Sequence, residues 1–75
     1  MDMEDKCMEL KWVDGFEIAV EIQGDEVVLS ANREGLLSLA NHLIALSGQD
    51  PGAHIHFDEY NSLEEGSSEL IVVLE

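Results

Sequence analysis

The stretch that decides the fold is residues 32–48, NREGLLSLANHLIALSG. Apolar residues recur here at every third or fourth position, whereas in the chain before it they recur at every second position. This periodicity is typical of an amphipathic α-helix. Asn32 is a good N-cap and Gly48 suits the position just after a helix, so a helix is expected over residues 33–47. Gly35 costs about 1 kcal/mol relative to alanine inside a helix, and is either required for close approach of a neighbouring strand or merely tolerated. The stripe expected to face the core consists of Leu36, Leu39, Ala40, Leu43 and Ser47, widened by Leu37, Ile44 and Leu46.

Before this helix, apolar and polar residues alternate, which predicts three strands joined by tight turns. The first strand is expected over residues 8–12 and the second over residues 16–22, with an Asp-Gly turn at residues 14–15 between them. The third strand, residues 26–30, follows a Gly-Asp turn at residues 24–25. The second strand alternates most strictly, and its expected inward face consists of Phe16, Ile18, Val20 and Ile22.

After the helix, two more strands are expected. Residues 54–58 alternate again, with Ile55 and Phe57 directed inward, whereas residues 70–74 are almost continuously apolar and favour a strand that is buried on both sides or central. The fold class is therefore α+β in the order β-β-β-α-β-β: a single antiparallel or mixed sheet of four or five strands with one helix packed on one face. A single domain is expected over residues 8–75, preceded by a frayed acidic N-terminus at residues 1–7.

The composition excludes several classes of protein. The 75 residues include three Lys or Arg and seventeen Asp or Glu, which gives a net charge of −14 at pH 7. That charge repels phosphates and anionic lipids, and so argues against nucleic-acid and membrane partners. Cys7 is the only cysteine, which excludes an internal disulfide, and it lacks the spacing of a zinc finger. Because 45% of the residues are apolar and no apolar run is long enough to span a bilayer, a folded cytoplasmic protein is expected, with an N-terminus too acidic for a signal peptide.

The most distinctive local pattern is His54-x-His56-x-Asp58, which places three potential ligands on one face of a strand. Two imidazoles and a carboxylate suit zinc or iron, with a fourth ligand supplied by a glutamate elsewhere in the chain. The simpler interpretation is an outward polar face, because one straight strand does not easily bring all three side chains onto one ion. No metal and no cofactor is therefore assigned, and the three residues are kept as weak metal-ligand candidates.

No enzyme activity is expected. The serines lie in loops without a GxSxG turn, the start of the helix lacks a glycine-rich phosphate loop, and the chain is too short for a deep pocket. A charge of −14 exceeds what solubility requires and can steer the protein onto a basic partner. Binding of a basic protein is therefore favoured over an acidic domain without such a role.

Two parts of the chain, residues 32–40 (NREGLLSLA) and residues 52–63 (GAHIHFDEYNSL) with residues 66–71 (GSSELI), resemble the immunity protein 32 family of bacterial polymorphic-toxin systems. The resemblance covers roughly residues 16–74. It implies a small protein that binds and neutralises a cognate toxin, and it supplies no catalytic residue. Taken with the charge, it predicts a basic toxin, such as a nuclease, as the partner.

The contact surface is expected on the outer face of the sheet and the loops beside it. Its predicted residues are Glu17 and Glu21 for charge, His54, His56 and Asp58 for polar contacts, and Tyr60 as an aromatic anchor at the rim. Two alternatives stay open: a metal-binding or sensor domain built on the histidine strand, and an accessory protein-interaction domain. A homodimer through an exposed edge strand, such as residues 70–74, also stays open.

Overall fold

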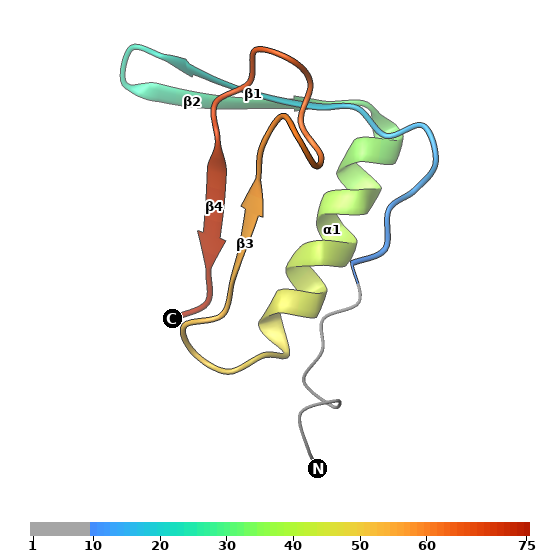
Figure 1. Ribbon diagram of the computed structural model, residues 1–75, viewed down its shortest axis with the longest axis vertical. Coiled ribbons are helices and arrows are strands. Elements are labelled where there is room, and N and C mark those ends of the chain that lie inside the picture. The colour runs from blue at the N-terminus through green and yellow to red at the C-terminus, as the bar shows by residue number, and fades with distance from the viewer. Residues whose placement is uncertain (1–9) are drawn as a thin grey trace.

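The computed structural model describes residues 10–75, which contain one helix and four strands in two separate sheets (Figure 1). The elements are β1 (Ile18–Gln23), β2 (Glu26–Ala31), α1 (Arg33–Ser47), β3 (His54–Phe57) and β4 (Leu70–Val73). β1 pairs with β2, and β3 pairs with β4, both in antiparallel register. The α+β class is confirmed, but the strands form two hairpins instead of the single sheet that was expected.

The two sheets stay separate because the β1–β2 hairpin crosses above β3 and β4 and does not run beside them (Figure 1). The loop between β3 and β4 joins the two sheets through hydrogen bonds to β1. In this loop the Glu64 backbone N–H donates to the Ile18 carbonyl, and the Ser68 N–H donates to the Val20 carbonyl, each at 2.8 Å. Ile18 and Val20 are fully buried, so this end of the hairpin caps the core.

The first predicted strand is not formed in the part of it that the structure describes. Its residues 8–9, like the N-terminus predicted to fray, lie outside the described residues, and residues 10–13 have no strand structure. The segment is attached to α1 through side chains: the Val13 N–H donates to Ser38 Oγ at 2.8 Å, and Asn41 Nδ2 donates to the Lys11 carbonyl at 3.2 Å. Backbone groups that would pair with a strand are bonded to the helix instead. The expected turn at residues 14–15 is present, with Gly15 at φ +85°.

The ends of α1 lie where the sequence predicts them. Asn32 is the N-cap, and its Oδ1 accepts hydrogen bonds from the Gly35 N–H at 2.7 Å and the Glu17 N–H at 3.0 Å. Asn32 Nδ2 also donates to the Gly15 carbonyl at 2.9 Å. One asparagine therefore begins the helix and fastens the chain that leads into β1.

The face that α1 turns to the core differs from the expected one. Of the residues predicted to form the core stripe, Leu39 and Leu46 are buried, whereas four large apolar residues are exposed: Leu36, Leu37, Leu43 and Ile44. The helix buries Gly35, Ser38, Leu39, His42 and Leu46. Apolar periodicity alone therefore assigned the wrong orientation to the helix about its axis.

Close approach at Gly35 explains this orientation. A Cβ atom at this position would overlap the Glu17 carbonyl oxygen and lie 3.0 Å from both Ala31 Cβ and Ile18 Cγ1. Only glycine lets the first turn of α1 approach the base of the hairpin this closely. Of the two explanations given for this glycine, close approach of a strand is correct.

β3 and β4 cover the core side of the helix with alternate residues. Ile55 and Phe57 are buried, as predicted. β4 is an edge strand that is half-buried on one face only, with Ile71 and Val73 exposed on the other, so the expectation of a strand buried on both sides is wrong. The apolar core consists of Ile18, Val20, Leu39, Leu46, Ile55, Phe57 and Leu63.

Candidate functional site

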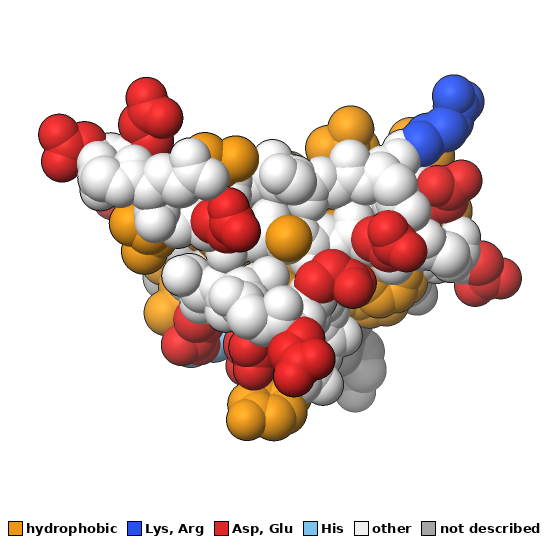
Figure 2. Space-filling model, turned by 90° about the horizontal axis from the view of Figure 1, so that it is seen from above, with side chains coloured by type: hydrophobic (Ala, Val, Ile, Leu, Met, Phe, Trp, Pro, Cys, Tyr) orange, Lys and Arg blue, Asp and Glu red, His pale blue; other side chains and the backbone are white. Residues whose placement is uncertain are grey.

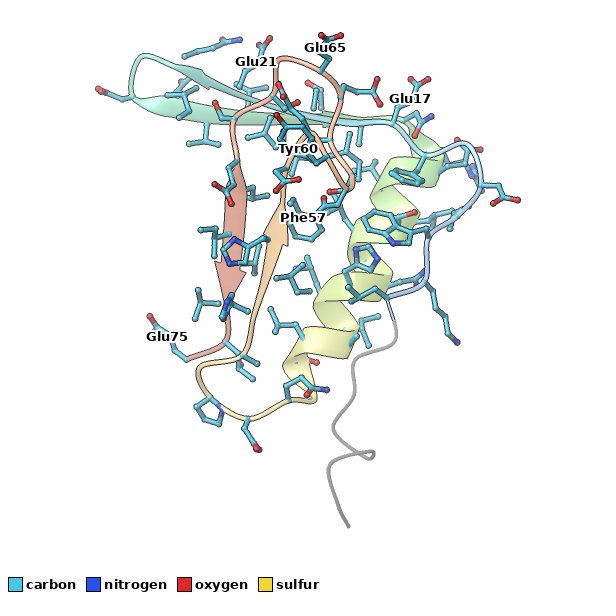
Figure 3. All side chains as sticks on the ribbon, in the orientation of Figure 1. Glu17, Glu21, Phe57, Tyr60, Glu65 and Glu75 are labelled. Carbon is cyan, nitrogen blue, oxygen red and sulfur yellow. The ribbon has the colours of Figure 1, made fainter. Side chains whose placement is uncertain are left out.

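Acidic side chains gather on the outer face of the β1–β2 hairpin. Glu17 precedes β1, and Glu21 lies within it on the same side as Glu17. Figure 3 shows both directed away from the core, together with Glu65 from the loop between β3 and β4. Seen from above, Asp and Glu side chains are spread across this face (Figure 2). We call the surface formed by Glu17, Glu21, Glu64 and Glu65 the acidic face.

A shallow hollow of about 270 Å³ lies within the acidic face. Its lining residues are Glu17, Ile18, Ala19, Ser30, Ala31, Asn32 and Glu64. The hollow lies where two small residues meet across the hairpin, since Ala19 is paired with Ser30. Glu17 and Glu64 supply two carboxylates beside these small side chains. An open, acidic hollow suits a basic side chain projecting from another protein better than an enclosed small molecule.

The predicted histidines lie on the other sheet. His54 and His56 are exposed on the outer face of β3, with their ring centroids 5.0 Å apart. His56 Nδ1 is 3.0 Å from Glu69 Oε2, and His54 Nδ1 is 3.2 Å from the Gly52 carbonyl oxygen. Each imidazole therefore has a polar partner of its own within the chain.

Asp58 does not join the two histidines. Its Oδ1 accepts hydrogen bonds from the backbone N–H groups of Tyr60 and Asn61, at 2.9 and 3.1 Å, and so forms the turn that follows β3. Within residues 10–75, no three side chains of His, Cys, Asp or Glu are grouped so that they could hold a metal ion. The geometry therefore does not favour the metal-binding alternative.

Tyr60 lies on the loop that Asp58 shapes, and its side chain is 94% exposed. The six predicted contact residues thus occupy three places: Glu17 and Glu21 on the hairpin, His54 and His56 on β3, and Asp58 and Tyr60 on the loop that follows. The single outer sheet face that was expected to carry them is absent, because the strands are divided between two sheets.

One unusual residue was missed by sequence reasoning. His42 is fully buried in α1, its ring edge-on to Trp12 at 3.9 Å and stacked on Phe57 at 5.8 Å between centroids. Neither ring nitrogen has a hydrogen-bond partner. Burial lowers the pKa of His42 below its ordinary value of 6.5. The sequence does contain a signal for this burial: His42 follows Gly35 by seven residues, which places both residues on the same face of the helix.

The sequence matches the family model of immunity protein 32 over residues 26–75. The chain belongs to the immunity protein 32 family. No curated protein and no solved structure matches it. Membership in this family indicates, in general terms, a protein that neutralises a toxin by binding it, and such proteins are typically not enzymes.

The match begins at the first residue of β2. It includes α1, the histidine strand and the loop with Tyr60, whereas β1, with Glu21, and the preceding Glu17 lie before it. In the part of the chain that the structure describes, no helix is long and apolar enough to cross a membrane.

Proposed function

We propose that this immunity protein neutralises a basic toxin by docking its acidic face onto the positively charged surface of that toxin. The observation that carries the proposal is the open hollow beside Glu17 and Glu64, set among further carboxylates on a chain of net charge −14. Lys11 and Arg33 are the only Lys or Arg among residues 10–75, so they offset little of the negative charge of the protein.

A nuclease is the toxin class that fits this chemistry best. Proteins that bind nucleic acid present lysine and arginine side chains to the phosphates, and an array of carboxylates can occupy the same side chains. Opposite charge also accelerates the encounter, with association rates that rise as the salt concentration falls. A rapidly formed complex suits a protein that must protect its own cell.

The remaining predicted residues have distinct roles in this proposal. Tyr60 is the aromatic anchor, since an exposed tyrosine contributes large contact area at a small cost in side-chain entropy. Asp58 positions it by accepting the hydrogen bond of the Tyr60 N–H. His54 and His56 provide a second, polar contact area on β3 for a toxin large enough to reach around the hairpin.

Charge reversal tests the acidic face. We expect Glu17→Lys/Glu21→Lys to slow association with the toxin by roughly tenfold or more, and to flatten its dependence on salt. Asp25→Lys/Glu26→Lys at the hairpin turn is the matched control, because it changes the net charge by the same amount at residues that are not part of the acidic face. The measurement is binding kinetics between 50 and about 500 mM salt, with the toxin captured from the source cells and then purified.

Growth provides the functional measurement. Expression of the purified toxin's gene should arrest cells, and co-expression of the wild-type immunity protein should restore growth. Equal losses of toxin binding in Glu17→Lys/Glu21→Lys and in the control Asp25→Lys/Glu26→Lys would mean that the net charge attracts the toxin but that the acidic face is not the contact surface. A captured toxin that is acidic, or a complex insensitive to salt, would contradict the proposal.

A further inference from the structure

The outer face of α1 is an apolar surface on an otherwise acidic protein. It consists of Leu36, Leu37, Ala40, Leu43 and Ile44, all exposed to solvent, with Ile44 70% and Leu36 55% exposed. The core side of the helix packs on the β-hairpins, and one flank is bonded to the segment before β1 through Ser38 and Asn41. Large apolar side chains gathered on one exposed face mark an interaction surface.

This face is symmetric about Ala40. Leu36 and Ile44 lie four residues on either side of it, and Leu37 and Leu43 lie three residues on either side. In an interface between two identical chains related by a two-fold axis, each residue i that meets residue j of the other chain is matched by j meeting i. An axis at Ala40 therefore sets large apolar residues only against large apolar residues. The small Ala40 side chain at the centre lets two helix backbones approach closely.

We propose that the outer face of α1 binds the same face of a second copy of this chain, with the two helices antiparallel and Ala40 at the two-fold axis. Leu36 of each copy then packs against Ile44 of the other, and Leu37 against Leu43. The core of each subunit is left unchanged, because none of these side chains is buried in the single chain.

Charge favours this face over the rest of the surface. Two chains that each carry −14 repel one another wherever their carboxylates meet. The only charged residues of α1 are Arg33 and Glu34. At 100° per residue, Arg33 lies about 20° from the direction of Ala40, whereas Glu34 lies about 120° away, off the outer face.

Arg33 also has a complementary site on the other copy. Antiparallel packing about Ala40 places Arg33 beside Ser47, in the last turn of the neighbouring helix. That turn is the negative end of the helix dipole and contains no basic residue of its own. Each copy therefore supplies the cation that the helix of the other copy lacks.

The predicted dimer through the edge strand is less favourable. Among residues 10–75, β4 pairs with β3 alone, so its second edge is open for pairing in this part of the chain. Antiparallel pairing of two copies about Val72 would, however, set Glu69 of one copy opposite Glu75 of the other. Directly opposed like charges destabilise a strand pair, whereas the helix pairing sets apolar residues against apolar residues and Arg33 beside the uncharged Ser47.

Sedimentation velocity over a range of protein concentrations tests the helix dimer. We expect Leu36→Gln/Ile44→Gln to weaken the dimer at least about tenfold, since it removes buried apolar contacts while keeping the charge and the helix propensity. Ile22→Gln/Val27→Gln is the matched control, because these side chains are 65% and 63% exposed on the β1–β2 hairpin. A monomer at every concentration and salt, or a dimer insensitive to the helix variant, would overturn the proposal.

Cysteine cross-linking tests the antiparallel arrangement, in a Cys7→Ser background that removes the native thiol. Ala40→Cys should form a covalent dimer on oxidation. Leu36→Cys alone and Ile44→Cys alone should not, whereas their mixture should form a cross-linked heterodimer. Efficient self-linking of Leu36→Cys would indicate parallel helices and contradict the proposal.

Salt separates this inference from the proposed function. Screening reduces the repulsion between two acidic copies, so the helix dimer should become tighter as salt rises. The toxin complex should become weaker over the same range. If the helix variant instead abolishes toxin binding while the wild-type chain is monomeric, the outer face of α1 is occupied by toxin, and the dimer proposal fails while the immunity function stands.

Discussion

The two faces of α1 show the reverse of the usual pattern, in which the buried face of a helix is the more apolar one. The buried face contains glycine, serine and histidine beside two leucines, whereas the exposed face carries three leucines and an isoleucine. Specific contacts hold the buried face in place: Gly35 against the hairpin backbone and Ser38 Oγ on the Val13 N–H. The helix is therefore docked by shape and hydrogen bonds, which leaves its most apolar side available for a second protein.

Truncation of one leucine on each face gives the largest expected difference. Leu39→Ala should lower the free energy of unfolding by about 3 kcal/mol, since it opens a cavity in the core. Leu37→Ala on the outer face should change it by no more than about 0.5 kcal/mol. Urea unfolding at low micromolar protein concentration makes the comparison, because dilution limits any contribution from self-association.

Equal destabilisation by the two substitutions would break the comparison between the faces. A larger loss for Leu37→Ala than for Leu39→Ala would mean that the helix is rotated about its axis. In that case the outer face of α1 would be part of the core.

Two glycines sharpen the same comparison with a somewhat smaller effect. Gly35→Ala should cost about 2 kcal/mol, because the added methyl group meets the backbone of the hairpin and outweighs the gain in helix propensity. Gly48→Ala is the control: a Cβ there lies 3.7 Å from the Ala45 carbonyl oxygen, and its φ of −91° suits any residue. Thermal unfolding should show a lowered Tm for the first variant and little change for the second. A raised Tm for Gly35→Ala would exclude the close approach.

Local signals predicted the elements of the fold well. The start of α1 follows from the N-cap Asn32, and the β1–β2 turn from Gly24, whose φ is +62°. These are preferences of single residues for particular backbone conformations, so they are readable along the chain. The arrangement of the hairpins was not predictable in this way, because it depends on hydrogen bonds between distant residues, such as Glu64 with Ile18.

The candidate site was predictable in composition but not in layout. The outward direction of Glu17, Glu21 and the two histidines follows from strand alternation. Alternation places a residue on a face but does not say to which sheet the face belongs, and so the single contact surface became separate areas. The role of Asp58 was also hidden, since its bonds to Tyr60 and Asn61 form only once the chain turns after β3.

The smallest expected effect concerns His42, the titratable residue of the buried face. Burial lowers the pKa of His42, so the unfolded chain binds a proton at this residue more readily than the folded chain. Stability due to this group is therefore present above pH 6.5 and is lost as the pH falls below it. Between pH 7 and 5.5 the loss should be no more than about 1 kcal/mol, the limit for one imidazole over that interval.

Urea unfolding across this pH range, compared between wild type and His42→Leu, measures the effect. The variant should show a flatter pH dependence, because no imidazole needs to stay neutral inside the core and no ring nitrogen lacks a hydrogen bond. His54→Gln/His56→Gln, altered on the exposed face of β3, should retain the wild-type slope if His42 is its source. If the pH dependence of the free energy of unfolding disappeared in His54→Gln/His56→Gln and persisted in His42→Leu, the buried face would not respond to pH. Packing would then be the only reason for a histidine at position 42.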